Sequence, residues 1–394
     1  MPAPVLPPNP VQIFSQDELA ARLQSAVTAT IGFKERLALF WSNHFTVAGV
    51  NPRVRIVCGS FEREAIRPHL AGRFEDMLLA AESHPAMLMY LDNAQSFGPT
   101  SQAGRNRKRG LNENLAREIL ELHTLGVDGG YSQADVTRFA EILTGWTVVG
   151  AQANGGEPGT FLFRPQMHEP GIRKVLGRDY PQTGMGQGKA VLSDLARHPA
   201  TARHIATKLV RHFIADTPPP AAVKRVQEAF TSSGGQLMTV YEELLSAPEA
   251  WEPATSKLRT PYEYAVALYR ALKLPILLTP ETGTSGLGAG TVSVNEINQI
   301  TRLLTLTGQP VFSAPSPKGW PEEAAAWAAP DAFKTRLDMA ENAARRVATL
   351  RPLELAEDIL GPRLTDETRT AIRRAETSYQ GLALMLMSPE FQRR

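Results

Sequence analysis

Hydrophobic residues recur every three or four positions along most of this chain, which is the period of an amphipathic helix. In "GFKERLALFWSNHF", for example, Leu37, Phe40, Trp41 and His44 fall at helical spacing. Similar stretches fill the rest of the sequence, without an internal repeat or a sustained heptad. We therefore expect a mostly α protein, built as a multi-helical single large domain.

Polar and turn-forming residues divide this pattern into elements. The proline-rich residues 1–14 predict an irregular arm, followed by one helical domain over residues 15–394. Ser15, with Glu18 three residues later, has the capping-box pattern of a helix start. Asn112 is expected to cap a helix that ends near Gly126, and Ser132 with its Asp at position 135 starts the next.

Residues 147–188 interrupt the helical pattern because they are rich in Gly and Pro. Two short β-like runs, at residues 161–163 and 173–176, lie on either side of a "HEPG" turn. We expect them to form one small β-hairpin inserted among the helices.

Composition narrows the class of function. The 394 residues carry 42 Lys and Arg against 40 Asp and Glu, so no strong field points to nucleic acid as a partner. Cys58 is the single cysteine, which excludes an internal disulfide framework. No apolar run approaches the roughly 20 residues of a membrane span. The N-terminus lacks the pattern of a secretory signal, so cytoplasmic is the default expectation.

The stretch "GLNENLAREILELHTLG", residues 110–126, is the first candidate site. On a helix, Glu113, Asn114, Arg117, Glu118 and Glu121 share one side, and apolar residues occupy the other. The ordinary explanation is a solvated face with an i,i+4 ion pair. The functional explanation is a carboxylate cluster in which Arg117 orients one acid and crowding raises the pKa of another.

Three histidines raise similar alternatives. His123 falls on the apolar side of that helix, where a hydrogen-bonded core residue is expected. In "FWSNHFTV", Asn43 and His44 form either a core hydrogen-bond network or the floor of a pocket. His168 is expected at the hairpin tip, where loop polar residues are useful functional hints.

Other chemistry finds weaker support. Histidine and glutamate ligands are present, but no metal-ligand spacing is, so no cofactor is predicted and a divalent metal belongs only to an alternative hypothesis. "TGMGQGKAV" lacks the first Gly and the final hydroxyl of a phosphate-binding loop. The basic face of residues 203, 204, 208 and 211 is expected to be solvated, or to contact an anionic polymer or an acidic partner.

Several of these stretches together resemble one known family, the domain-of-unknown-function-1800 family of bacterial proteins. The resemblance covers about residues 33–338. It rests on "FWSNHFTV", "HPAMLMYLDN", "NENLAREILELHTLGVDGGYSQADV", "LTGW", "FRPQMHEPG", "HPATARHIATKLVRHF" and "SPKGWP". The polar motif positions are Asn43, His44, Asp92, Asn93, Asn112 to Asn114, Arg117, Glu118, Glu121, Thr144 to Trp146, and His168.

The resemblance implies a largely helical protein but no established reaction. Members usually have a longer N-terminal region, often with an export signal, so a periplasmic or exported location is expected if this start is truncated. Genes of the family often neighbour those of a phosphatase-like protein, of the domain-of-unknown-function-1501 family.

Three functional hypotheses follow. The leading one is a carboxylate-dependent hydrolase of envelope or extracellular polysaccharide. In it Glu118 is the general acid and Glu113 or Glu121 its partner. Binding is assigned to Asn43, His44, Asn114, Arg117, Trp146 and His168. The second is a metal-binding protein with His and Glu ligands. The third is a non-catalytic partner of the phosphatase-like neighbour protein.

Overall fold

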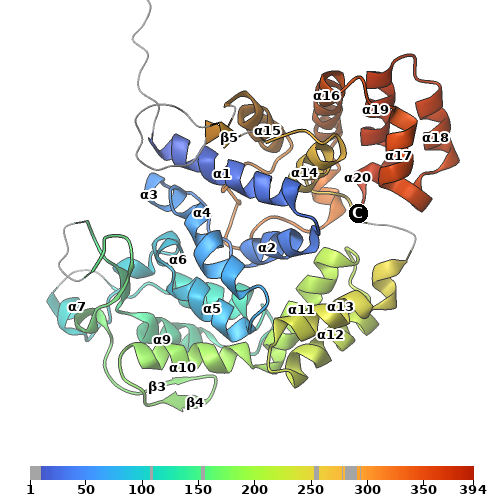
Figure 1. The fold of residues 1–394 in the computed structure, drawn as a ribbon. Coiled ribbons are helices and arrows are strands. Elements are labelled where there is room, and N and C mark those ends of the chain that lie inside the picture. The colour runs from blue at the N-terminus through green and yellow to red at the C-terminus, as the bar shows by residue number, and fades with distance from the viewer. Residues whose placement is uncertain are drawn as a thin grey trace, which may run out of the picture. The chain divides into compact units, whose positions relative to one another are not determined.

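The computed structural model in Figure 1 describes residues 10–106, 110–151, 156–252, 257–276, 278–279, 291–292 and 294–394. These residues are mostly helical, which confirms the predicted fold class. They form two compact units, for which the sequence provided no signal. Unit 1 comprises the described parts of Met1–Glu35, Trp251–Ser313 and Trp320–Arg394, and unit 2 comprises Arg36–Ala250 and Ala314–Gly319.

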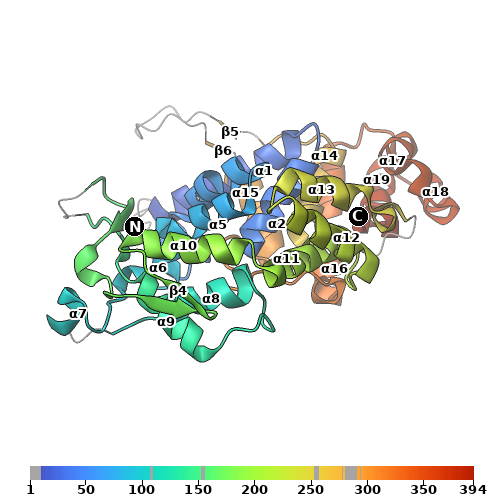
Figure 2. The same cartoon turned by 90° about the horizontal axis from the view of Figure 1, so that it is seen from below.

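Unit 2 holds the predicted site residues. Its helices, with α2 entering from unit 1, are α2 (Phe33–His44), α3 (Pro52–Arg55), α4 (Cys58–Phe61), α5 (Phe74–Ser83), α6 (Pro85–Tyr90), α7 (Gln102–Asn106), α8 (Asn114–Glu118), α9 (Gln133–Leu143), α10 (Met185–Ala196), α11 (Pro199–Phe213), α12 (Pro220–Ser232) and α13 (Leu237–Ser246). Figure 2 shows α11 and α12 side by side, and α13 packs on α12. Two short π-helices, η1 (Glu62–Ile66) and η4 (Ile119–His123), continue α4 and α8.

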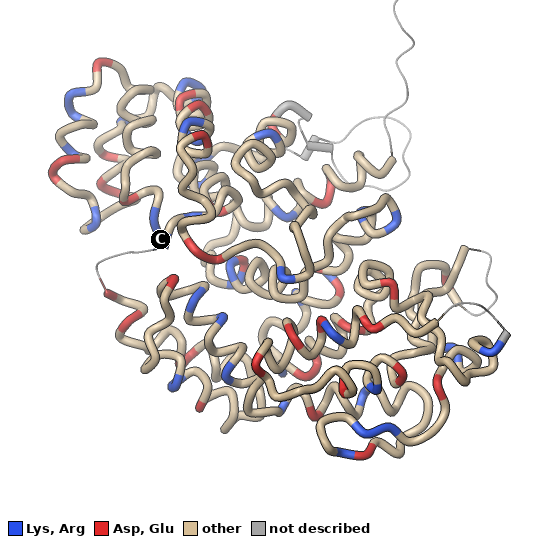
Figure 3. The backbone as a smooth tube through the Cα atoms, turned by 180° about the vertical axis from the view of Figure 1, so that it is seen from behind, with Lys and Arg blue, Asp and Glu red and all other residues tan. Residues whose placement is uncertain are grey.

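Unit 1 is a second helical assembly. Its helices are α1 (Pro10–Thr28), α14 (Pro261–Ala271), α15 (Val294–Leu306), α16 (Pro330–Arg346), α17 (Pro352–Leu360), α18 (Asp366–Arg373), α19 (Ser378–Met387) and α20 (Pro389–Gln392). Contacts run from α1 to α14, from α15 to α16, and from α16 to α19. Figure 3 shows acidic and basic residues interspersed along the chain in both units. No helix within the described ranges has the length and apolar character needed to traverse a lipid bilayer.

The predicted β insertion is present and both β-like runs are strands, but the expected pairing of the two runs with each other is wrong. In unit 2, β2 (Phe161–Phe163) pairs with β1 (Trp146–Val148), and β3 (Arg173–Val175) pairs with β4 (Arg178–Tyr180). Gly145, at φ +87°, turns the chain after the end of α9, and the residues that follow form β1, the pairing partner of β2. The two runs therefore belong to separate antiparallel ribbons. In unit 1, β5 (Leu278–Thr279) pairs with β6 (Thr291–Val292).

Helix starts were predicted with mixed success. The capping box of Ser132 and Asp135 is present at the start of α9. By contrast, α1 already begins at Pro10, so residues 10–14 are helical; Ser15 lies inside the helix and its hydroxyl donates to the carbonyl of Val11. Residues 1–9 of the predicted arm lie outside the described residues. Glu113 occupies the N-cap position of α8, but the predicted cap residue Asn112 does accept from the backbone N–H of Asn114 at 2.9 Å.

The core of unit 2 is aromatic around the end of α2. Trp41 is fully buried and donates from Nε1 to the hydroxyl of Tyr241 on α13 over 2.6 Å. The ring of Phe45 stacks on that of Trp41 at 6.0 Å, and Phe74 lies 5.7 Å from Trp41. His44 belongs to the same cluster, because its ring contacts those of Trp41 and Phe45, and only 1% of its surface is exposed.

Candidate functional site

The helix formed by α8 and η4 presents two different groups of glutamates. Glu113 is held in a polar network: it accepts from Thr137 at 2.6 Å, from Gln133 at 2.8 Å and from Arg117 at 3.0 Å. The hydrogen bond from Thr137, reinforced by Gln133 and Arg117, lowers the pKa of Glu113. Glu113 is therefore an ionised anchor between α8 and α9, and Arg117 is its ion-pair partner.

Glu118 has the opposite environment. It is half-buried, and it has no hydrogen bond or ion pair with any residue that the structure describes. Burial raises the pKa of Glu118, and the neighbouring charges of Glu121 and Glu82 act in the same direction against His123 and Arg117. Glu121, also half-buried and directly paired with no described residue, lies three positions further along. A raised pKa favours the protonated form of a carboxyl group, which is the form that a general acid uses.

A shallow groove of about 670 Å³ lies at the start of α8. Its lining is polar, with Glu113 at one side and the other members Asp92, Gln95, Gly110, Leu111, Asn112 and Asn114. Asp92 adopts a left-handed conformation at φ 58°, which directs the chain from α6 into the groove wall. Asn114 is exposed in this wall, and Glu118 follows it at the i,i+4 spacing that makes side chains neighbours on a helix. The groove and Glu118 therefore belong to one face of the helix.

Two histidines close the other end of the same helix. The last carbonyl groups of a helix have no partner within it. His44 Nε2 lies 3.1 Å from the carbonyl oxygen of His123, and His204 Nε2 lies 3.0 Å from that of Leu122. The Thr124 hydroxyl donates to the carbonyl of Ile119. Since a carbonyl only accepts, both histidines carry their proton on Nε2.

These two histidines are neutral. Burial lowers the pKa of His44 well below 6.5, helped by the charge of Lys208. Burial likewise lowers the pKa of His204 to about 4. His204 thus points inward from α11, which corrects its predicted place on a solvated basic face. His44 and His204 therefore hold the end of the carboxylate-bearing helix within unit 2 by hydrogen bonds, and we assign them a structural role.

A buried acid completes this group. His123 Nδ1 lies 2.7 Å from Glu82 Oε1, and neither side chain is exposed. The ring centroids of His123 and His44 are 5.9 Å apart. The predicted core position of His123 is confirmed. Glu82 was missed, because a glutamate near the end of α5 has no sequence feature that marks it as buried.

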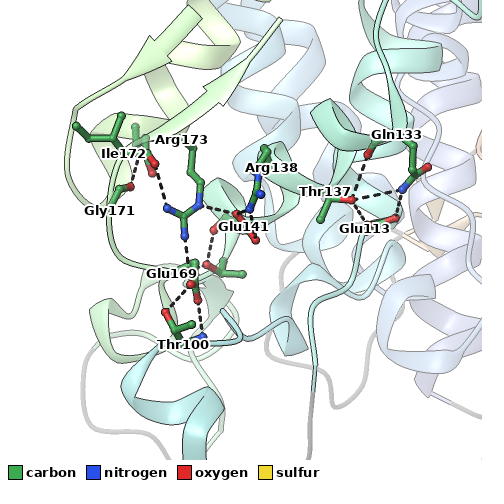
Figure 4. A network of polar contacts seen from close by, with 12 residues as sticks. Thr100, Glu113, Gln133, Thr137, Arg138, Glu141, Glu169, Gly171, Ile172 and Arg173 are labelled. Carbon is green, nitrogen blue, oxygen red and sulfur yellow. Dashed lines mark hydrogen bonds and ion pairs between the residues drawn. The ribbon is translucent and has the colours of Figure 1, made fainter. Parts of the chain in front are cut away.

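His168 and its neighbours form a different cluster, drawn in part in Figure 4. His168 Nδ1 contacts the carbonyl of Thr144 at 2.9 Å, and burial lowers its pKa. Glu169 accepts from the Thr100 backbone at 2.8 Å and from Arg173 at 3.2 Å. Arg173 also bonds Glu141 on α9 at 2.5 Å. This network fastens the segment between the two ribbons to α9.

Other predicted binding residues have packing positions. Trp146 is fully buried in β1 against Phe161, at a centroid distance of 5.6 Å. Asn43 is half-buried, and Gly319 of the "SPKGWP" stretch packs so closely on it that a Cβ there would lie 2.5 Å from the Asn43 carbonyl oxygen. The structure therefore gathers His44 with the α8–η4 helix, while Trp146 and His168 belong to the β1–β2 region.

Two tyrosines near Glu118 were not identified from the sequence. Burial, then the charge of Glu118, raises the pKa of Tyr90 to about 12. Burial, then the charges of Glu121 and Glu118 with those of other neighbours, also raises the pKa of Tyr131. Tyr90 belongs to the "HPAMLMYLDN" motif and precedes the motif residue Asp92 by two positions in the sequence. This position was the only sequence feature that could have identified it. Among the described residues, no group of three or more His, Cys, Asp or Glu is arranged to hold a metal ion.

Comparison with known families gives one result over nearly the whole chain. A family described as "Protein of unknown function (DUF1800)" matches residues 8–393. The match is longer than the segment in which the motifs show the resemblance. Searches of curated proteins and of solved structures gave no match.

Proposed function

Since the chain belongs to the DUF1800 family, whose description assigns no activity, we propose a function from the α8–η4 helix. The proposed function is a carboxylate-dependent hydrolase that cleaves polysaccharide of the cell envelope or the extracellular space. The observation that carries it is the environment of Glu118. This side chain is half-buried, has no hydrogen bond or ion pair with a described residue, has a raised pKa, and follows the groove residue Asn114 by four positions on the same helix.

Glycoside cleavage needs one protonated carboxyl group and one ionised carboxylate. Glu118 supplies the first, because burial favours its neutral form. We assign the second role to Glu121, whose carboxylate has no hydrogen bond or ion pair with a described residue. Glu113 is the weaker choice, because its oxygens already accept from Thr137, Gln133 and Arg117.

The groove suits a neutral ligand with many hydroxyl groups. Side-chain amides of Asn112 and Asn114 offer both donors and acceptors, and the carboxylate of Asp92 offers acceptors. The Oδ1 of Asn112 is occupied by the backbone N–H of Asn114 at 2.9 Å, which fixes the orientation of that amide. Its Nδ2 group can then donate to a sugar hydroxyl.

The test is an activity assay on a panel of envelope and extracellular polysaccharides, in which the release of reducing ends measures hydrolysis. We expect Glu118→Gln to lower kcat by about 100-fold or more, as loss of a general acid does. Glu113→Gln is the matched control on the same helix, and its effect should remain within about 10-fold. The proposal is wrong if the wild-type protein cleaves no member of the panel, or if Glu118→Gln cleaves as fast as wild type.

The sealed position of His44 favours a second candidate, a non-catalytic partner of a phosphatase-like protein. A histidine that is 1% exposed and caps a helix serves architecture rather than substrate contact. Co-purification with the phosphatase-like neighbour, unchanged by Glu118→Gln, would favour this candidate over the hydrolase. The metal-binding alternative gains no such support from the described residues.

A further inference from the structure

Three arginines gather at the start of α14 in unit 1. Arg336 of α16 is fully buried, with its guanidinium carbon 5.1 Å from the ring of Tyr264. Arg259, just before α14, lies 5.0 Å over the ring of Phe391. Arg394 follows α20, and its side chain is 8% exposed. Hydrogen bonds to the segment before α14 bring them together. Arg336 Nη2 donates to the backbone carbonyl of Arg259, and the backbone N–H of Arg394 donates to the carbonyl of Lys257.

The negative charge in this cluster is small. Glu263 is the one carboxylate, within the described part of the chain, that forms an ion pair with any of the three arginines: its Oε1 lies 3.0 Å from Arg394 Nε. Its Oε2 accepts from the backbone N–H of Thr260 at 2.9 Å, in the capping box of α14. Counting the side chains of these four residues alone, three guanidinium groups and one carboxylate give an excess of two positive charges. The N-terminus of the 11-residue α14 adds to the positive potential.

Several donors of the cluster are unused. Arg259 Nη1, Arg336 Nε and Arg394 Nη1 are buried without a hydrogen-bond partner among the described residues. A buried charged donor left without an acceptor is costly, so such groups normally have one. Burial lowers the pKa of Arg259 and of Arg336 to about 10, and at Arg259 the charges of Arg394 and Arg336 act in the same direction as burial. Arg259 is only half-buried, so part of this residue is in contact with solvent.

We propose that Arg259, Arg336 and Arg394 form a binding site for a tetrahedral oxyanion, that is, a phosphate group. The planar donor fork of arginine matches phosphate oxygens, and a divalent phosphate neutralises the excess charge. Gln392 completes one wall: its Oε1 accepts from Arg336 Nη1 at 2.8 Å and holds that guanidinium in place. The site is formed by residues of unit 1, whereas the glutamates of α8 and η4 belong to unit 2.

The experiment is a titration of the full chain with inorganic phosphate at constant ionic strength, with chloride as the replaced ion. We expect one saturable site by calorimetry and a rise in Tm of about 3 °C at ten times the Kd. Arg259→Gln should abolish both effects. Arg351→Gln, which removes a surface arginine whose side chain is 79% exposed, should retain them.

Parallel titrations separate the alternatives. Sulfate should bind like phosphate, because the geometry is the same, and acetate should bind at least 10-fold more weakly. If Arg259→Gln does not fold, Arg259→Lys retains the charge without the fork and should bind phosphate more weakly than wild type. Absence of saturable binding to wild type, equal affinity for acetate, or undiminished phosphate binding by a folded Arg259 variant would overturn the proposal.

Discussion

His44 Nε2 lies 3.1 Å from the carbonyl oxygen of His123, the last residue of the π-helix η4. The end of the carboxylate-bearing helix is therefore closed by side chains from other helices, His44 from α2 and His204 from α11. π-Helices are rare and occur frequently at functional sites. The positions of Glu118 and Glu121 thus depend on histidines that are far away in the sequence.

Replacing His44 should destabilise unit 2. His44→Ala leaves a buried carbonyl without a donor and opens a cavity among Trp41, Phe45 and Phe74, which we expect to cost about 3 kcal/mol. Urea unfolding at pH 7 measures this. His69→Ala is the control, because the side chain of His69 has no hydrogen bond to a described residue; its cost should stay below about 0.5 kcal/mol. Equal costs for the two variants would show that the cap contributes nothing.

Stability should fall as the pH is lowered from about 6.5 to about 4. The pKa of His204 is about 4 in the folded protein, against 6.5 when it is unperturbed, so the unfolded chain binds more protons between these values. The stabilising contribution is complete above pH 6.5 and is lost as the pH falls. His204→Gln retains a donor for the carbonyl of Leu122 but does not titrate. We expect the wild type to lose about 2 kcal/mol more than His204→Gln between pH 7 and 4.5, measured by urea unfolding.

Substitution of two glycines, Gly126 and Gly130, distinguishes the cost of backbone strain from the cost of a steric clash with His204. Gly126 and Gly130 have nearly the same left-handed φ, +85° and +82°. A Cβ on Gly126 would lie 3.0 Å from Nδ1 of His204, whereas one on Gly130 would meet nothing within 4 Å. Gly130→Ala should therefore cost about 1 kcal/mol, and Gly126→Ala about 2 kcal/mol or more. Identical free energies of unfolding for the two variants would mean that His204 is not held in place there.

A second pair of glycines tests the packing of the "SPKGWP" stretch on α2. Gly319 and Gly308 have φ values of +85° and +86°. A Cβ on Gly319 would lie 2.5 Å from the carbonyl oxygen of Asn43, and one on Gly308 would be free. We predict that Gly319→Ala lowers Tm by at least 4 °C more than Gly308→Ala. Similar melting temperatures would contradict the close contact with Asn43.

The helical class and most helix positions could be predicted because they depend on local periodicity. The α2 pattern and the capping box at Ser132 are both present. Pairing of short strands is not local, however, and the run at residues 161–163 pairs with β1 rather than with the run at 173–175. The start of α1 at Pro10 was missed because Ser15 resembles an N-cap even though it lies within a helix.

The site was predictable only in part, for the same reason. The sequence suggested Glu118 as an acid with Glu113 or Glu121 as its partner, but it could not show that Glu113 is the one anchored by α9. The inward direction of His204 and the buried Glu82 depend on which helices pack together. These contacts join residues up to 82 positions apart, so no local pattern contains them.

The most direct test of the account is the titration of Glu118 and Glu113 in the folded protein. Carbon-13 NMR of labelled glutamate carboxyl groups, assigned with Glu118→Gln and Glu113→Gln, measures both pKa values in one sample. We predict that Glu118 titrates above the usual value of about 4.3 and Glu113 below it. A pKa of Glu118 at or below that of Glu113 would contradict the assignment of Glu118 as the acid.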